Sequence, residues 1–523
     1  MATRRDELNA YSFARRRTVA AFLQPSPHGS EEGAPRPLKT VLPSLGVGVL
    51  VLVGFGAWGM LSPTAPKGWD NVGEKVLVGS ESTTRYVLVK TKGEQKASLH
   101  PVLNLASARL LLKPDKFEVV KVKESVLDES KYSMGATIGI PFAPDRLPSK
   151  KDAESAKVWS LCEAPGGGED KKSRKATYVL DNADYEKLLH RGKGELGRSG
   201  ALYVEGPPVT GDGRGNEYMV TSDGRAYLIG GEVSDDESNL HKVLRLQLKR
   251  AMLGDEAQPQ EVSKEFLGTL LPGGVVEFPK PEGAGTNADL PGVDPKYTKV
   301  GLVLSIATAS GKEQQYVVLK KGVQRVSPFT AQLLLRNPYL EDLYEGEVPE
   351  PVKVSINDII PVDGEWMSEM KWPASTVEQS NTQSEGGNSV SCSVYHGKRD
   401  DITGLRKMTM WVGRDYPKDV SQSGSSSYVS PGSGLLFKRV TGTAGGGGNV
   451  YLVTDTGLRY SVPATNDSSV TGAAKGDQEQ TNTAQMRLGY DKVLPASVPA
   501  AWADLLAAGP ELSSGNAEQA QGS

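Results

Sequence analysis

The side chains that perform catalysis or bind metals are sparse in this 523-residue sequence. Its five histidines include no His-Glu-x-x-His pair of the kind that binds catalytic zinc. No serine occupies a Gly-x-Ser-x-Gly elbow between a strand and a helix, and acidic pairs such as Asp235 and Asp236 are most simply solvated. We therefore expect no catalytic residues, no metal site and no cofactor.

Glycine-rich segments could bind nucleotides, because backbone amides in such loops bind phosphates. A P-loop needs glycine, four residues, Gly-Lys and then serine or threonine, and no stretch fits. The four glycines at 445–448 lead into a predicted strand, and the segment 192–197 lacks the preceding buried strand of a dinucleotide site. The sequence therefore predicts a protein that is not an enzyme.

Composition excludes further classes of protein. There are 60 lysines and arginines against 63 acidic residues, so the formal charge of -3 provides no basic field for nucleic acid. The length predicts several domains. The two cysteines permit at most one disulfide and exclude an all-cysteine zinc site.

An apolar segment near the N-terminus predicts a membrane helix. No residue is charged between Lys39 and Lys67, and the 21 residues 41–61 would rise roughly 32 Å as a helix. We expect a transmembrane helix at 40–62, with a buried core helix or a cleaved signal peptide as alternatives. The arm before it carries a net charge of +3, which predicts a single-pass protein of the inner (plasma) membrane with a cytoplasmic N-terminus and most of the chain extracytoplasmic.

The sequence of the arm predicts an amphipathic helix over 4–23. Helical spacing places Leu8, Tyr11 and Phe22 on one face. These three residues are candidates for docking on a cytoplasmic partner. The alternative is a solvated basic arm that contacts anionic lipid.

The remainder of the chain contains an internal duplication. Tyr86 and Tyr316 open similar strands 230 residues apart, and Cys162 and Cys392 are also 230 residues apart. The strand-turn-strand segment 217–227 returns at 450–460. The sequence predicts an α+β extracytoplasmic domain of two tandem halves with pseudo-two-fold symmetry, in which four small β/α repeats surround a central core.

Local similarity within the halves sets the expected boundaries. Phe266 matches Trp502, and Leu270 matches Leu506. The predicted segments are a cytoplasmic arm at 1–39, the membrane helix at 40–62, repeats at 76–150, 216–278, 297–372 and 449–510, core segments at 151–215 and 373–448, a linker at 279–296 and a flexible tail at 511–523.

The duplication also bears on the cysteines. Cys162 and Cys392 would be equivalent residues on the pseudo-two-fold axis, and the extracytoplasmic compartment is oxidising. We predict a disulfide between them that fastens the two halves together, and two separately buried thiols are the alternative.

Two segments carry a resemblance to a known family. They are Arg-Arg-Asp-Glu-Leu-Asn-Ala-Tyr-Ser-Phe at 4–13, followed by Arg16 and Arg17, and Pro-Val-Leu-Asn-Leu-Ala-Ser-Ala-Arg-Leu at 101–110. With one predicted span and two cysteines, the chain resembles the EccB family of the type VII (ESX) secretion system over nearly its whole length. Glu7 stands where a glutamine is expected, which affects only local contacts of the arm.

The resemblance implies a structural core subunit of a membrane complex that exports small helical proteins. It implies the EccC motor ATPase, EccD, EccE and the mycosin protease as partners, self-association in a symmetric oligomer, and repeats similar to a phage-lysin wall-binding module. Because the sequence lacks a phosphate loop, we assign ATP hydrolysis to a partner. An ATP-hydrolysing component and a cell-wall (peptidoglycan) anchor are the alternatives.

Overall fold

The computed structural model describes most of the chain, and its contacts divide the chain into two compact units. The N-terminal unit comprises Met1–Trp69, Leu77–Thr83 and Val120–Lys131, and the main unit comprises Asp70–Val76, Thr84–Val119 and Tyr132–Ser523. The described residues are 3–23, 37–61, 65–165, 173–190, 194–291, 293–308, 311–344, 346–382, 387–401, 403–419, 426–441, 448–463 and 484–521.

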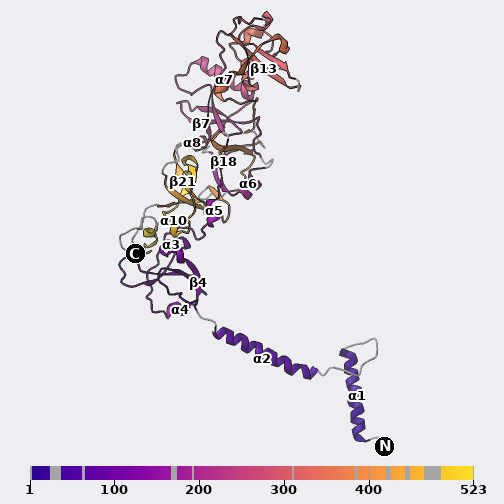
Figure 1. The fold of residues 1–523 in the computed structure, drawn as a ribbon, viewed down its shortest axis with the longest axis vertical. Helices are drawn as coiled ribbons and strands as arrows, with labels where there is room; N and C mark the ends of the chain where they lie inside the picture. Colours follow the sequence, from indigo (N-terminus) through magenta and orange to yellow (C-terminus); the bar gives the residue numbers. More distant parts are fainter. Residues whose placement is uncertain are drawn as a thin grey trace. The chain divides into compact units, whose positions relative to one another are not determined.

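The N-terminal unit contains two long helices, drawn in indigo in Figure 1. Helix α1 is Arg4–Leu23, as the sequence predicts, and α2 is Pro37–Leu61. Within the described residues, no helix combines the length and the apolar character needed to cross a membrane. The unit also contains α4 (Glu124–Asp128), where the Glu124 carboxylate accepts hydrogen bonds from the backbone N–H groups of Glu81 and Ser82.

Three parts of the main unit share one topology. In each, an antiparallel meander of three strands is extended at both edges by strands that run parallel to their neighbours. Repeat 2 is β7 (Gly200–Pro208), β8 (Gly215–Thr221), β9 (Arg225–Ile229), α7 (Asn239–Leu253), β10 (Gln260–Glu261), α8 (Lys264–Thr269) and β11 (Leu271–Val276).

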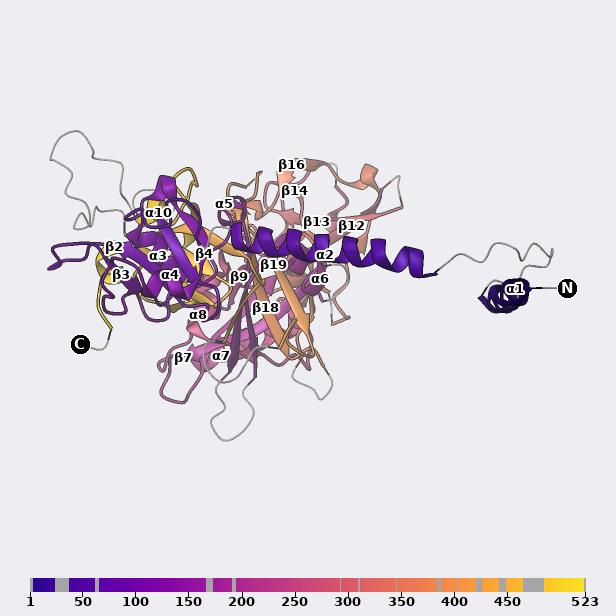
Figure 2. The same cartoon turned by 90° about the horizontal axis from the view of Figure 1, so that it is seen from below.

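The same order of strands returns twice in the second half. Repeat 3 is β12 (Val303–Ala307), β13 (Glu313–Leu319), β14 (Gly322–Arg325), α9 (Pro328–Leu335), β15 (Val352–Lys353) and β16 (Pro361–Glu365). Repeat 4 is β21 (Gly434–Val440), β22 (Val450–Thr454), β23 (Leu458–Val462), α10 (Ala484–Arg487), β24 (Ala496–Pro499), α11 (Ala500–Ala503) and β25 (Ala507–Ala508). Figure 2 shows β12, β13, β14 and β16 gathered together in repeat 3.

The recurring strand-turn-strand segment has a backbone reason. Gly224 and Gly457 occupy the turns between β8 and β9 and between β22 and β23, and both have φ of 78°. This left-handed conformation favours glycine, so the same turn sequence recurs in both repeats.

The remaining elements belong to the first repeat, to the centre and to the segments that flank them, except β17, which pairs with β7 of repeat 2. They are β1 (Lys75–Gly79), β2 (Arg85–Val89), β3 (Ser98–Pro101), α3 (Leu105–Leu111), β4 (Glu118–Val122), α5 (Lys150–Glu154), β5 (Val158–Ala164), β6 (Arg174–Leu180), α6 (Asn182–Leu188), β17 (Glu378–Gln379), β18 (Val390–Arg399), β19 (Arg406–Gly413), β20 (Ser427–Val429) and α12 (Ser514–Ala517). Helices α3, α7, α8 and α9 each begin after an asparagine or serine whose side chain accepts a hydrogen bond from a backbone N–H of the first turn.

Two predicted domain boundaries disagree with the positions of the observed strands. The boundary at 215/216 separates β7 from most of β8, although these strands pair antiparallel from Ala201 to Pro208. The predicted core segment 373–448 includes β21, which pairs with β22 and β24 in repeat 4. The first strands of repeats 2 and 4, β7 and β21, precede the strand-turn-strand segment that is the clearest match between the repeats. The predicted repeats start at that segment and therefore begin too late.

The tail also differs from the sequence prediction of a flexible segment. Leu512 and Ala517 are fully buried, and α12 packs on α3. The N–H of Gln521 donates to the carbonyl of Thr137 at 2.8 Å. Through residue 521, the C-terminal segment is therefore part of the packed structure. Within the predicted linker, Ala288 is buried in a core cluster of repeat 3.

Candidate functional site

The centre of the main unit is a sheet to which both halves of the chain contribute. Its strand order is β19-β18-β5-β6-β20. The first half supplies the hairpin of β5 and β6, the second supplies β18 and β19, and β5 pairs antiparallel with β18. Because the pairing of β5 with β18 is antiparallel, the residues that face each other at the middle of this pair come one from each half of the chain.

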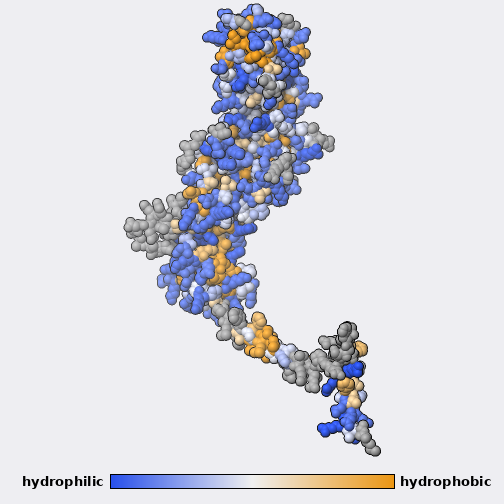
Figure 3. Space-filling model, turned by 45° about the vertical axis from the view of Figure 1, so that its right-hand side comes forward, coloured by the Kyte–Doolittle hydropathy of each residue, from blue (hydrophilic) through white to orange (hydrophobic). Residues whose placement is uncertain are grey.

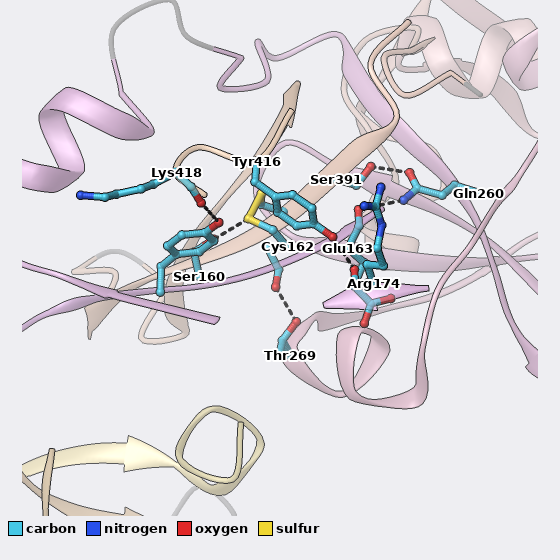
Figure 4. Close-up of a disulfide and its surroundings, with 12 residues drawn as sticks. Ser160, Cys162, Glu163, Arg174, Gln260, Thr269, Ser391, Tyr416 and Lys418 are labelled. Carbon is cyan, nitrogen blue, oxygen red and sulfur yellow. Dashed lines mark hydrogen bonds between the residues drawn. A yellow bond between two sulfur atoms is a disulfide. The ribbon is translucent and has the colours of Figure 1, made fainter. Parts of the chain in front are cut away.

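Those facing residues are the two cysteines. Cys162 lies opposite Cys392 in the β5–β18 register, and a disulfide joins them, with their Cα atoms 4.0 Å apart (Figure 4). Both are completely buried. Thiol exchange requires access to a sulfur atom, so the position suits a permanent structural bond and not a redox-active one. The predicted pairing is present in the structure.

Polar side chains next to the disulfide attach repeat 2 to the central sheet. The Glu163 carboxylate accepts hydrogen bonds from the N–H of Ser263, at 2.8 Å, and from its hydroxyl. Gln260 donates to the Glu163 carbonyl at 3.1 Å and accepts from the Ser391 hydroxyl at 2.7 Å. These contacts therefore place the start of α8 against β5, and β10 against both β5 and β18.

Glu163 is an unusual residue at this position because its side chain is fully buried. Burial raises the pKa of this carboxyl, while the two hydrogen bonds from Ser263 act in the opposite direction. Its carboxylate is already used to hold α8. The geometry thus indicates a structural acceptor and not a catalytic acid.

Beneath the central sheet, equivalent residues of the two halves share one apolar cluster. Phe266 and Trp502 are both fully buried in it, and their neighbours Leu270 and Leu506 are also buried there. Trp502 lies 5.7 Å from Tyr395 of β18, measured between ring centroids. Repeats 2 and 4 are therefore anchored on the central sheet by the residues that the sequence comparison pairs.

The outer repeats attach to their neighbours through helices. In repeat 3, α9 packs on α7 of repeat 2, and Gln332 donates to the Ala251 carbonyl at 2.8 Å. On the other side, α3 packs on α10 of repeat 4. Here Arg109 donates to the Leu488 carbonyl at 3.1 Å, while Arg487 donates to the Leu110 carbonyl at 2.9 Å. The pattern of contacts repeats on both sides of the central sheet.

Potential metal ligands do not converge in the described part of the chain, where no group of three or more His, Cys, Asp or Glu side chains could hold an ion. His396 lies in β18. Burial, with Lys407 and Lys398 nearby, lowers the pKa of His396 to about 4, and its Nε2 lies 3.1 Å from the Thr409 hydroxyl. The ring also packs edge-on against Tyr185. This is a packed, neutral histidine.

The candidate docking residues of the arm all lie on α1. Leu8, Tyr11 and Phe22 are 69%, 72% and 90% exposed. The structure thus presents them to other molecules and does not use them in the fold of the described residues.

Sequence reasoning missed the polar network around Glu163. A glutamate within the fully buried strand Val158–Ala164 was its one visible signal, because an acidic residue in a buried strand needs hydrogen-bond donors. Its partners lie about 100 residues away in sequence, so no local pattern identifies them.

Comparison with known proteins shows which family shares this architecture. A family model described as "Type VII secretion system ESX-1, transport TM domain B" matches residues 1–523. The chain belongs to this family. It is the EccB family, so the resemblance seen in the sequence is confirmed.

Curated EccB relatives match to different extents. The chain is 29% identical over 295 residues to "ESX-2 secretion system ATPase EccB2" of Mycobacterium tuberculosis (strain ATCC 25618 / H37Rv), a match that covers 54% of this chain and about half (50%) of that protein. It is 26% identical over 516 residues to "ESX-3 secretion system ATPase EccB3" of the same strain, covering 92% of this chain and 83% of that protein.

Solved EccB structures share the fold. A chain in "Structure of an intact ESX-5 inner membrane complex, Composite C3 model" superimposes with a TM-score of 0.55 at 20% identity, covering 100% of this chain and 96% of that one. A chain in "Structure of EccB3 dimer from the ESX-3 core complex" gives a TM-score of 0.56 at 22% identity, covering 84% and 99%.

Proposed function

We propose that this EccB chain is a structural core subunit of a type VII (ESX) protein secretion membrane complex, and that it scaffolds the machine and forms its extracytoplasmic part. Family membership over residues 1–523 carries the proposal. The geometry supports it, because the centre of the main unit is occupied by packed strands, a disulfide and a shared apolar cluster. Such a centre holds surfaces in place for partners.

The proposed topology is a single membrane pass through the uncharged sequence 41–61, with α1 in the cytoplasm. The net charge of +3 on the preceding arm supports this orientation. The buried disulfide supports an oxidising compartment for the main unit, since such bonds persist outside the cytosol. The proposed location is therefore the inner membrane with the bulk of the chain extracytoplasmic.

The proposed partners are the EccC motor ATPase, EccD, EccE and the mycosin protease, together with further copies of this chain. The solved relatives named above as an EccB3 dimer and as part of an ESX-5 inner membrane complex support self-association and assembly. The exposed side chains of α1 are the proposed cytoplasmic contacts.

A complementation experiment tests the role. In a strain that lacks this chain, export of the small helical proteins of the same secretion system should stop, and the full chain should restore it. A variant with Leu8 and Tyr11 replaced by Asp should reach the membrane and fail to restore export. Normal export without the chain would refute the proposal.

A second candidate function is ATP hydrolysis, which the names of the EccB2 and EccB3 relatives favour. The absence of a P-loop from the sequence argues for a partner as the source of turnover. Full-length chain purified without partners should hydrolyse ATP only at the background rate. Turnover that a point substitution in this chain abolishes would establish the second function instead.

A cell-wall anchor is a third function that is compatible with scaffolding. It predicts that the full chain sediments with isolated peptidoglycan, and recovery entirely in the supernatant would eliminate it.

A further inference from the structure

Helix α7 carries apolar side chains that the described chain leaves largely exposed. It has 15 residues, whereas α9, which has the same place in repeat 3, has 8. The buried residues of α7, Leu248, Ala251 and Met252, all lie in its C-terminal half. In its N-terminal half, Leu240 and Val243 are 60% and 50% exposed. Helix surfaces that face only water are normally polar, so these residues indicate a surface for a partner.

A cavity lies beside this half of the helix. Its volume is about 190 Å³, and its apolar walls come from α7, from the segment after β11 and from repeat 3. We call these apolar wall residues the α7 cavity: Leu240, Leu244, Leu248, Phe278 and Tyr339. Leu248 and Phe278 also belong to the core that repeat 2 shares with α9, so packing fixes their positions before anything binds. Figure 3 shows hydrophobic residues gathered at the end of the main unit where Figure 1 labels α7 and β13.

The size and lining of the α7 cavity determine what fits it. Sites for small molecules usually have volumes of roughly 300–1,000 Å³, so a cavity of about 190 Å³ is too small for a typical cofactor. Arg245 also lines it, but its Nη2 group donates to the Glu237 carboxylate and to the Glu232 carbonyl, which turns its charge toward the chain itself. A single apolar side chain of another protein is the ligand that this space admits.

The rim of the α7 cavity is basic. His241 and Lys280 lie at it, and the Lys280 ammonium is 5.5 Å from the centroid of the Tyr339 ring. Helix α7 itself contains two lysines and two arginines and no acidic residue. Among the described residues that line the cavity, Glu277 is the one acidic side chain. The rim therefore favours a partner with negative charge.

Two acidic residues of the loop before α7 are used within the chain. Asp235 accepts a hydrogen bond from the N–H of Gly211 at 2.9 Å. Glu237 accepts from Arg214 and from Arg245, and its side chain is only 4% exposed. These carboxylates are thus paired inside repeat 2 and leave Lys280 available to a partner.

We propose that the α7 cavity binds an extracytoplasmic segment of a different protein, in which a leucine or aromatic side chain is flanked by acidic residues. The apolar side chain enters the cavity, and the acidic residues pair with Lys280 and accept a hydrogen bond from His241. The inference rests on the proposed function, in which this chain is a scaffold for partners, and it adds the surface and the chemistry of one partner contact.

Photo-crosslinking in native membranes tests the contact. The full-length chain would carry benzoylphenylalanine in place of Leu240, at the edge of the α7 cavity. We expect mass spectrometry to find position 240 linked to a different protein, within a segment that combines a leucine or aromatic residue with neighbouring acidic residues. The same photo-crosslinker at Val209, which is 56% exposed on repeat 2 and does not line the cavity, is the matched control and should give no link to that segment.

Charge reversal supplies the second measurement. Lys280→Glu should lower the yield of the crosslink from position 240 about fivefold, which is the effect of one exposed ion pair. Replacement of the neighbouring acidic residue of the linked segment by lysine should restore the yield in the Lys280→Glu background. Lys312→Glu, at an exposed lysine of repeat 3 that does not line the cavity, should leave the yield unchanged. Equal melting temperatures of both variants and the parent would show that neither change disturbs the fold.

Four outcomes overturn the inference. They are links from position 240 only to a second copy of this chain, the absence of any link to protein, a linked segment without acidic residues, and a yield that Lys280→Glu does not change. Co-purification of the motor ATPase is measured in the same membranes. If the motor ATPase co-purifies while position 240 gives no link to a different protein, the scaffold function stands and the contact proposed here is wrong.

Discussion

Removal of the disulfide is the perturbation whose size the structure defines best. Cys162→Ser breaks a covalent loop of 230 residues and leaves the backbone pairing of β5 with β18 in place. In the chain-entropy model, closing a loop of that length stabilises the folded state by about 5 kcal/mol. Residual structure in the unfolded chain reduces this value, so we expect a loss of about 3 kcal/mol.

A thermal melt of the full chain under non-reducing conditions measures the loss. About 3 kcal/mol should lower the melting temperature of a unit of this size by about 3 °C, because its unfolding entropy is roughly 0.9 kcal/mol/K. Protease digestion should become faster at 279–296, between the halves, while the three strands of each repeat meander stay protected.

Two controls separate the bond from the side chain. The double variant with Cys162 and Cys392 both replaced by Ser should be no less stable than either single variant, because one bond is lost in all three. Parent protein treated with reductant and denaturant should approach the same stability. A melting temperature within about 1 °C of the parent, or recovery of both cysteines as free thiols from exported protein, would refute the reasoning.

Three further predictions concern substitutions of individual side chains. Leu8→Asp together with Tyr11→Asp should release the chain from its complex while it remains in the membrane; Phe13→Asp, on the opposite side of α1, is the matched control, and equal losses would remove the docking role. Since the pKa of His396 is about 4 in the fold and about 6.5 in an unfolded chain, the unfolded state binds more protons between these values, so stability should fall by up to about 3 kcal/mol as pH drops from 6.5 to 4. His396→Gln should flatten that part of the stability profile, and an unchanged profile would contradict the assignment. Leu512→Asp should destabilise the fold by about 3 kcal/mol because it puts a charge into a fully buried site next to β23, and a change below about 0.5 kcal/mol would show that the tail is not packed there.

Sequence spacing was enough to predict the central arrangement. Equal separations of 230 residues for a tyrosine pair and a cysteine pair indicate that the cysteines are equivalent, and Cys162 and Cys392 do lie opposite each other in the β5–β18 pair, where a disulfide joins them. One shared core likewise contains the residues that the sequence comparison matched, Phe266 with Trp502 and Leu270 with Leu506.

The tail could not be predicted from its sequence. The segment 511–521 is mostly polar and small, which is also typical of disordered ends. Its order comes from partners far along the chain, such as the Leu110 carbonyl, which accepts from the Ser514 hydroxyl across 404 residues of sequence. Contacts of that separation leave no periodic signal.

The first strands of repeats 2 and 4 were missed for a different reason. Each strand joins its repeat by pairing with the next strand, while its own sequence carries only weak similarity to its counterpart. Gly200-Ala-Leu-Tyr and Gly434-Leu-Leu-Phe are the matching starts, and they are too short to stand out before the pairing is known.

Purification of the tagged full chain from its native membrane in mild detergent, followed by native mass spectrometry, tests the central claim most directly. The scaffold account predicts a large assembly that contains several copies of this chain together with a motor ATPase and other membrane subunits. Recovery of the chain as a single copy without partners, hydrolysing ATP by itself, would contradict the account.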